Sequence, residues 1–175
     1  IQNINTRDTN VILGEKQRVL YGKGYIEDTL CGVNFQISAK SFYQTNPIMT
    51  EKLYSYAINK AELTKDDVAF DAYSGIGTIG LIASKKAKEI ISVELVKEAV
   101  IDGIKNAKRN NIDNFRMYND DASSFMVRMA TNKQGVDVLF MDPPRKGSDK
   151  RFLDALLKLK PKRVVYVSCD CSTLA

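Results

Sequence analysis

From residue 68 onward the chain alternates between short apolar runs and longer segments with helical spacing, and this alternation constrains the fold most. The runs predict strands at 68–72, 90–93, 115–118, 136–141 and 163–168, with helices between them at 78–88, 97–110, 122–130 and 148–159. Parallel strands need crossover connections of this kind. The pattern therefore predicts an α/β fold with a doubly wound, mostly parallel sheet of five strands.

The first 40 residues follow a different pattern. Short β-rich runs at 10–13, 18–21 and 33–37 are separated by glycine-containing turns, which predicts a small antiparallel arm. A helix then begins at Pro47, capped by Asn46, and extends to about residue 63. The helical spacing of the apolar residues Leu53, Tyr56, Ala57 and Ala61 supports this helix. The predicted division is an arm at 1–40 and a main domain at 41–175.

Composition excludes several classes of protein. No apolar run approaches the roughly 18 residues that a membrane span needs. The chain has no His, and its 3 Cys lack the spacing of a zinc site, so we expect no metal. An odd number of Cys without a secretory signal favours free thiols in the cytoplasm. The absence of an initiator Met and of a closing turn at the end suggests a piece of a longer protein.

Positive charge is concentrated late in the chain. The 26 Lys and Arg against 21 Asp and Glu give a net charge of +5. The segment 145–163 holds eight of the basic residues and two acidic ones, a surplus of six. Such a segment could face an RNA phosphate backbone, on the side where the fourth and fifth strands end, or could be the solvated face of a surface helix. The sequence leaves both interpretations open.

The first predicted strand runs into a glycine-rich turn. Gly75, Gly77 and Gly80 match the pattern G-x-G-x-x-G, which alone is a weak indication of a nucleotide at a helix N-terminus. Asp71 precedes the first glycine by four residues. An acid at that position is typical of S-adenosylmethionine sites, where it lies near the cationic end of the cofactor.

Two further acids follow the next two strands. Glu94 ends the second strand, at the position where an acid accepts both ribose hydroxyls of a nucleotide. Asp121 follows the third strand and could take the adenine amino group. Each acid alone could be a helix cap or a surface charge. Because the carboxyl ends of parallel strands meet at one edge, the acids together predict a cofactor site.

The fourth and fifth strands end in residues that suggest a reaction. The fourth ends in Asp142-Pro143-Pro144-Arg145, and the prolines would stiffen the backbone next to the cofactor. Cys169 follows the fifth strand. A Cys in such a place is often only a small buried residue. A thiolate there could instead attack carbon 6 of a pyrimidine and activate carbon 5 for methylation. Cys171 is a weaker candidate.

Taken together these motifs resemble the uracil-5 RNA methyltransferase family, which makes 5-methyluridine in transfer or ribosomal RNA. The resemblance covers nearly the whole chain. It rests on the segments Phe42-Tyr43-Gln44-Thr45-Asn46, Asp71-Ala72-Tyr73-Ser74-Gly75-Ile76-Gly77, Asp142-Pro143-Pro144-Arg145-Lys146-Gly147 and Val167-Ser168-Cys169. One departure is Asp170-Cys171, where the family usually has Asn-Pro.

The resemblance implies a Rossmann-like methyltransferase sheet, truncated here after its fifth strand, with S-adenosylmethionine as cofactor and RNA as partner. It also implies a monomer with no membrane association. The general base would be a Glu beyond residue 175, so the chain alone is expected to be inactive. The implied catalytic residues are the nucleophile Cys169 and Asp142. The implied cofactor contacts are Gln44, Tyr73, Gly75, Gly77, Thr78, Glu94, Asp121 and Asp142.

Two alternatives stay open. An RNA cytosine-5 methyltransferase also uses a Cys nucleophile, but that group usually carries a Cys in the loop after the fourth strand, where this chain has Asp142-Pro143-Pro144-Arg145. A non-catalytic module that binds RNA or a cofactor is the other possibility.

Overall fold

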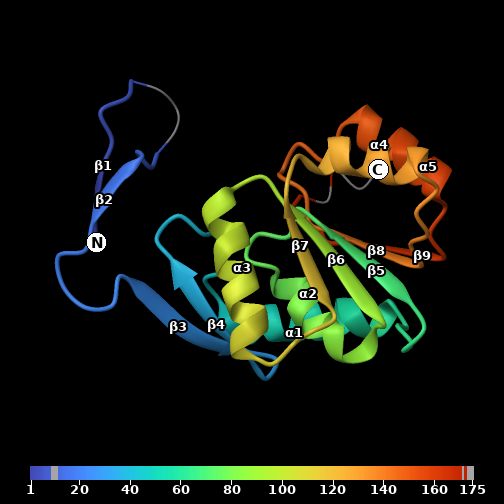
Figure 1. Cartoon of the computed structure of the whole chain (residues 1–175), viewed down its shortest axis with the longest axis horizontal. Helices are drawn as coiled ribbons and strands as arrows, with labels where there is room; N and C mark the ends of the chain where they lie inside the picture. The colour runs from blue at the N-terminus through green and yellow to red at the C-terminus, as the bar shows by residue number, and fades with distance from the viewer. Residues whose placement is uncertain (9–11, 171, 173–175) are drawn as a thin grey trace.

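The computed structural model describes residues 1–8, 12–170 and 172. Five parallel strands form one sheet in the order β7-β6-β5-β8-β9. The central strand, β5, comes first of these five along the chain. This order confirms the predicted doubly wound sheet (Figure 1). The strands are β5 (Val68–Ala72), β6 (Glu89–Glu94), β7 (Phe115–Asn119), β8 (Val138–Met141) and β9 (Arg163–Tyr166).

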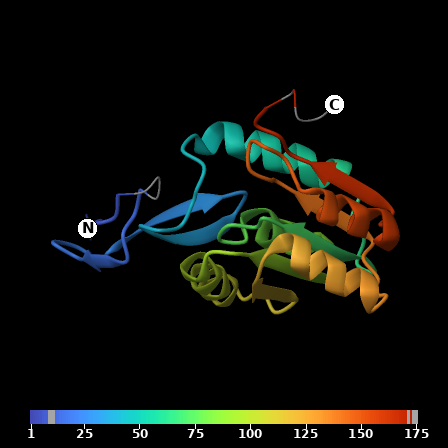
Figure 2. The same ribbon diagram turned by 90° about the horizontal axis from the view of Figure 1, so that it is seen from above.

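Helices cover both faces of this sheet (Figures 1 and 2). Alternate side chains of each strand point to opposite faces, so Ala69 and Phe140 join one buried apolar cluster while Phe70 and Leu139 join another. The first cluster packs under α1 (Pro47–Lys60), α2 (Thr78–Ala83) and α3 (Lys97–Arg109), and the second under α4 (Ala122–Thr131) and α5 (Lys150–Leu159). No helix in the described part of the chain has the length and apolar character needed to cross a membrane.

Three helices differ from the prediction, and the first of them, α1, ends at Lys60 and not near residue 63. The segment predicted as one helix at 78–88 is the short helix α2 followed by a 3-10 turn at Ser84–Lys86. Helix α5 is capped by Asp149, whose carboxylate accepts from the Phe152 N–H at 2.8 Å, and not by Ser148 as predicted. Both Ser and Asp are good N-caps, and the neighbouring Asp is the one that reaches the N–H.

The β-rich arm consists of two antiparallel hairpins. Of the three predicted strands, only 33–37 is confirmed, as β4 (Val33–Ser38), which pairs with β3 (Tyr25–Leu30). The other hairpin joins β1 (Gln2–Ile4) to β2 (Lys16–Arg18), so of the strand predicted at 18–21 only Arg18 lies in a strand. In the predicted strand 10–13, residues 10 and 11 lie outside the described residues, and Ile12 and Leu13 are not in a strand.

Only part of the apolar spacing in α1 faces the core: Ala57 and Ala61 are buried, but Leu53 and Tyr56 are not. Thr50, Tyr54, Ala57 and Ile58 are the residues that the helix buries, whereas Leu53 and Tyr56 are exposed. The helix is apolar on two sides, since Ile48 and Met49 continue the exposed one. Periodicity alone could not choose between these sides, and the choice places Tyr54 against the sheet.

Candidate functional site

A small cavity lies at the edge of the sheet where β5 and β8 end. Its volume is about 40 Å³. Of the residues predicted to bind the cofactor, Gln44, Tyr73, Gly75, Thr78 and Asp142 line this cavity. The remaining lining residues are Phe42, Tyr43, Tyr54, Asp71, Ser74 and Ile79. The structure thus brings together side chains from three separate motifs of the sequence.

The glycine-rich turn has the geometry that its sequence predicts. Gly75 and Gly77 have φ of +56° and +77°, in the left-handed region that favours glycine. Gly80 serves a different purpose, since a Cβ there would lie only 2.9 Å from the Asp71 carboxylate and from Ile90. The third glycine therefore permits α2 to pack closely on the sheet.

Asp71 is a buried carboxylate that links this turn to the sheet. Its Oδ2 accepts from the backbone N–H of Gly80 at 2.9 Å and lies 3.4 Å from the Ser92 hydroxyl oxygen. Gly80 is in the first turn of α2, where N–H groups have no partner within the helix. Burial raises the pKa of Asp71 to about 7, although these hydrogen bonds act to lower it.

Tyr73 connects the glycine-rich turn to the loop that follows β8. Its hydroxyl donates to the Ser148 hydroxyl oxygen at 3.0 Å, and its ring packs on Phe152 with the ring centres 5.4 Å apart. Tyr73 has φ of +60°, which is a costly conformation for a bulky residue. The predicted cofactor turn and the predicted reaction loop are therefore joined by a side chain that lines the cavity.

Glu94 lies at the carboxyl end of β6, as predicted, and its carboxylate is held by backbone groups. Oε2 accepts from the Gly75 N–H at 2.9 Å and Oε1 from the Val96 N–H at 2.8 Å. Each carboxylate oxygen can accept a second hydrogen bond. These contacts orient the carboxylate and leave it able to accept two hydroxyl donors.

Asp121 is the N-cap of α4. Its Oδ1 accepts from the backbone N–H of Ser124 at 2.9 Å and from the Ser124 hydroxyl at 2.8 Å. The capping role that the sequence left open for this acid is thus present. Oδ1 already accepts these two hydrogen bonds. Because Asp121 is exposed, its other carboxylate oxygen can accept a hydrogen bond from a ligand.

Asp142 and Cys169 follow neighbouring strands but differ in their surroundings. Asp142 lines the cavity directly after β8, and burial raises its pKa to about 6. Cys169 is exposed, three residues after the end of β9, and does not line the cavity. The buried location considered for this thiol is therefore wrong. Cys171 lies outside the described residues.

Sequence reasoning missed Tyr54 as a residue of this site. Tyr54 lies on the buried face of α1 and lines the cavity. Burial raises the pKa of its hydroxyl, and the nearby Asp142 acts in the same direction. Nothing distinguished it in the sequence from a core aromatic residue at helical spacing.

The basic segment 145–163 divides between the two edges of the sheet. Arg145 and Lys146 are exposed in the loop after β8, at the carboxyl edge. Lys162 lies at the opposite edge, where it pairs with Asp137 at 2.9 Å and Asp67 at 3.2 Å. The expectation that the whole segment lies beside the strand ends near Asp142 and Cys169 is therefore wrong, because α5 carries the chain back across the sheet before β9 begins.

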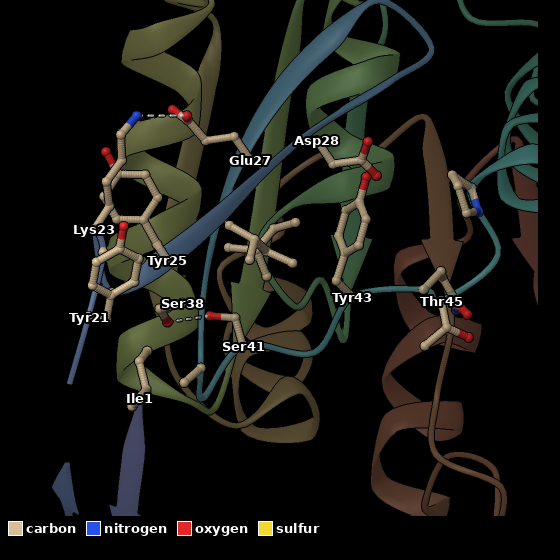
Figure 3. Close-up of a pocket in the computed structure, with 17 residues that line it drawn as sticks. Ile1, Tyr21, Lys23, Tyr25, Glu27, Asp28, Ser38, Ser41, Tyr43 and Thr45 are labelled. Carbon is tan, nitrogen blue, oxygen red and sulfur yellow. Dashed lines mark hydrogen bonds and ion pairs between the residues drawn. The ribbon is translucent and has the colours of Figure 1, made fainter. Parts of the chain in front are cut away.

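A larger hollow of about 770 Å³ lies between residues 21–28 and 37–47. Figure 3 shows that Tyr43 points its hydroxyl toward the Asp28 carboxylate there, while Ser38 and Ser41 are joined by a hydrogen bond. The two hollows share Tyr43 and Gln44. Gln44 is the only predicted site residue in the larger one, so the smaller cavity is the candidate reaction site.

Comparison with known proteins gives a consistent result. Residues 3–175 match the sequence profile of the family described as tRNA (uracil-5-)-methyltransferase. An uncharacterized RNA methyltransferase of Listeria innocua is 48% identical over 175 residues, which are 100% of this chain and 39% of that protein. The chain therefore spans about two fifths of the length of such relatives.

Solved structures agree. The tRNA (uracil-54, C5)-methyltransferase of Pyrococcus abyssi, in complex with S-adenosyl-L-homocysteine, superimposes with a TM-score of 0.75 at 28% identity over 98% of this chain and 41% of that one. A SAM-dependent methyltransferase from Agrobacterium tumefaciens has a TM-score of 0.64 at 18% identity, over 83% of this chain and 50% of that one. The second likeness shows the fold alone.

Proposed function

Because the chain belongs to the tRNA (uracil-5-)-methyltransferase family, we propose that it forms the S-adenosylmethionine domain of an enzyme that methylates carbon 5 of a uridine in transfer or ribosomal RNA. The observation that carries this proposal is the single cavity lined by Gln44, Tyr73, Gly75, Thr78 and Asp142. Residues 41–175 would form this domain. Residues 1–40 would be an arm, of which β3 and β4 pack on it.

The residues around the cavity fit a cationic cofactor. Asp71 and Asp142 are carboxylates in a largely buried space, and a positive charge there would favour their ionised forms. Glu94 keeps the capacity to accept ribose hydroxyls, and the exposed oxygen of Asp121 could accept from an adenine amino group. Gly75 and Thr78 line the cavity, and the positive φ of Gly75 and Gly77 would keep the turn tight beside the ligand. Because the cavity encloses only about 40 Å³, most of the cofactor would lie outside it, over Glu94 and Asp121.

The proposed mechanism assigns one covalent step to Cys169. Its thiolate adds to carbon 6 of the uracil, and the electrons of the carbon 5–carbon 6 double bond make carbon 5 nucleophilic. The methyl group that carbon 5 takes up would come from S-adenosylmethionine, which would be converted to S-adenosylhomocysteine. Asp142 orients the uracil beside the cavity. Removal of the carbon 5 proton restores the double bond and expels the Cys169 thiolate.

The test of this assignment is Cys169→Ala in the full-length protein. We expect this variant to lose methylation and to form no covalent adduct with RNA that contains 5-fluorouridine, as judged by gel mobility under denaturing conditions. Cys31→Ala is the matched control, because Cys31 lies in the turn between β3 and β4 and should leave both activities intact. A persistent adduct in the Cys169 variant would refute the assignment.

For residues 1–175 alone we propose cofactor binding without turnover. No base for the carbon 5 proton is assigned within this segment, and the family resemblance puts it beyond residue 175. Calorimetric titration with S-adenosylhomocysteine should therefore detect binding while methyl transfer to RNA stays absent. Multiple turnover by this segment would contradict the proposal.

The full-length enzyme would act as a monomer on RNA in the cytoplasm. Arg145 and Lys146, beside the proposed reaction loop, would contact the phosphate backbone.

A further inference from the structure

Helix α3 presents one polar side chain per turn to the outer edge of strand β4. Asn106 accepts from the backbone N–H of Gln36 at 2.7 Å through Oδ1, and its Nδ2 donates to the Gln36 carbonyl at 3.0 Å. Asn110 makes the same pair of bonds with Asn34, at 2.9 and 2.7 Å. Asp102 forms the third contact in this series. We call these three side chains the α3 ladder.

The spacing of helix and strand explains why the series can repeat. Four residues of an α-helix rise by about 6 Å, and two residues of a strand by about 6.6 Å. The side chains of residues 102, 106 and 110 therefore lie opposite the backbone groups of residues 38, 36 and 34. Helix and strand run in opposite directions. The α3 ladder forms hydrogen bonds with the backbone groups along the edge of β4, as a further strand would.

The third contact uses an acid where the other two use an amide. Asp102 Oδ2 accepts from the backbone N–H of Ser38 at 3.0 Å and from the Ser41 hydroxyl at 2.8 Å. The Ser38 carbonyl already accepts from the Ser41 N–H at 3.2 Å, so it needs no amide donor from the helix. At this contact only the Ser38 N–H and the Ser41 hydroxyl still need an acceptor. The buried carboxylate of Asp102, which only accepts hydrogen bonds, provides it.

The position of this contact relates it to the cavity. Ser41 precedes Gln44 by three residues, so Asp102 holds the turn from which the Phe42–Gln44 wall of the cavity begins. The same helix begins at Lys97, just after Glu94, whose carboxylate holds the Gly75 N–H of the opposite wall. Helix α3 thus connects both walls, while Asn110 lies at its far end.

We propose that Asp102 is a positioning residue for S-adenosylmethionine: by anchoring Ser38 and Ser41 to α3, it sets the place of Gln44 relative to the glycine-rich turn. This inference rests on the proposed function, because it assumes that Gln44 contacts the cofactor. Under this proposal, Asn106 and Asn110 only hold the β3–β4 hairpin against α3.

The experiment compares Asp102→Ala with Asn110→Ala in the full-length protein, each with and without Gln44→Ala. Binding of S-adenosylhomocysteine is measured by calorimetry and stability by urea unfolding. Asp102→Ala should weaken binding about tenfold, whereas Asn110→Ala should lower stability and leave affinity within about twofold. In the Gln44→Ala background the loss caused by Asp102→Ala should largely disappear, because residues that act together are not additive.

Two further variants separate positioning from general damage. Asp102→Asn keeps an oxygen that can accept both bonds, and it should restore affinity. Ser41→Ala removes only one donor, so it should fold and still weaken binding in the same direction. Equal losses of affinity for the Asp102 and Asn110 variants, or additivity with Gln44→Ala, would overturn the proposal.

The outcomes also distinguish this inference from the function on which it rests. If wild-type protein fails to bind S-adenosylhomocysteine, the proposed function fails and the cofactor role of Asp102 fails with it. Trypsin cleavage after Lys40 then still reports on the anchor, because Asp102→Ala should accelerate it and Asn110→Ala should not. Normal cofactor binding with an unchanged Asp102→Ala variant would refute the role of Asp102 alone.

Discussion

Asp71 shows how one side chain can combine a structural and a ligand-related role. Its carboxylate accepts the free N–H of Gly80 and so holds the start of α2 against the sheet, yet it also lines the cavity. In the chain alone the buried charge is unfavourable, which is why the pKa rises to about 7. A nearby cation would reverse that balance.

This pKa shift predicts a pH dependence of stability. Asp71 has a pKa of about 7 in the folded chain and 3.8 as its ordinary value. The folded chain therefore binds more protons between these values, and the free energy of unfolding should fall as the pH rises from about 4 to about 7, by at most about 1.4 kcal/mol per pH unit for this group. Urea unfolding between pH 5 and pH 8 measures the slope.

Asp71→Asn should remove most of this slope, because the amide keeps an acceptor for Gly80 and has no charge to bury. Asp142→Asn is the control, and should flatten the curve only below about pH 6. Acids with lowered pKa values, such as Asp67, titrate below this window and do not mask the effect. Stability that rises from pH 5 to pH 7 would contradict the interpretation.

At the scale of elements, the packing of α2 depends on the absence of a side chain at one position. A Cβ at Gly80 would lie 2.8 Å from the Ser92 hydroxyl oxygen and 2.9 Å from both Asp71 and Ile90. Gly80→Ala should therefore destabilise the chain by about 1–3 kcal/mol, although Ala is the better helix former. Gly135→Ala is the control, since nothing lies within 4 Å of its Cβ. Thermal unfolding of both variants tests this, and equal stabilities would refute it.

The division of the basic segment also has a consequence at this scale. Arg145 lies at the carboxyl edge, beside the proposed reaction loop, whereas Lys158 lies in the last turn of α5. Arg145→Ala should weaken RNA binding by the full-length protein and reduce the slope of log affinity against log salt by about one, whereas Lys158→Ala should change neither. Filter binding at several salt concentrations measures both, and an equal effect of the two variants would contradict the assignment.

Elements with a local signature could be predicted from the sequence, and contacts between distant segments could not. Local sequence patterns mark the strand Val68–Ala72, the glycines after it and the acid Glu94. The sheet and its carboxyl edge could therefore be predicted. Tyr54 was missed because α1 is apolar on two sides. The α3 ladder was missed because Asn106 and Asn110 look like ordinary polar helix residues until β4 is placed beside them.

At the scale of the whole molecule, the described residues form a parallel sheet with two edge strands, β7 and β9, of which β9 comes later along the chain. In the part of the chain that the structure describes, no strand pairs with the outer edge of β9. An uncovered edge can pair with another chain. We therefore expect residues 1–175 alone to self-associate as concentration rises, measurable by analytical ultracentrifugation.

Val164→Lys should reduce this self-association, because a charge on an edge strand opposes pairing. Leu157→Lys adds the same charge on the exposed face of α5 and is the matched control. If both variants reduce association equally, net charge and not the strand edge is responsible. Full-length protein should remain monomeric throughout.

The α3 ladder also sets an order of events during synthesis. The β3–β4 hairpin leaves the ribosome before α3, because the side chains that cover its edge follow 64 to 76 residues later in the chain. At about 5–20 residues per second, the ribosome needs roughly 3–15 s to reach them. During that time the edge of β4 lacks the side chains that satisfy its backbone groups in the folded chain, so the hairpin can reach its final hydrogen bonding only after α3 has emerged.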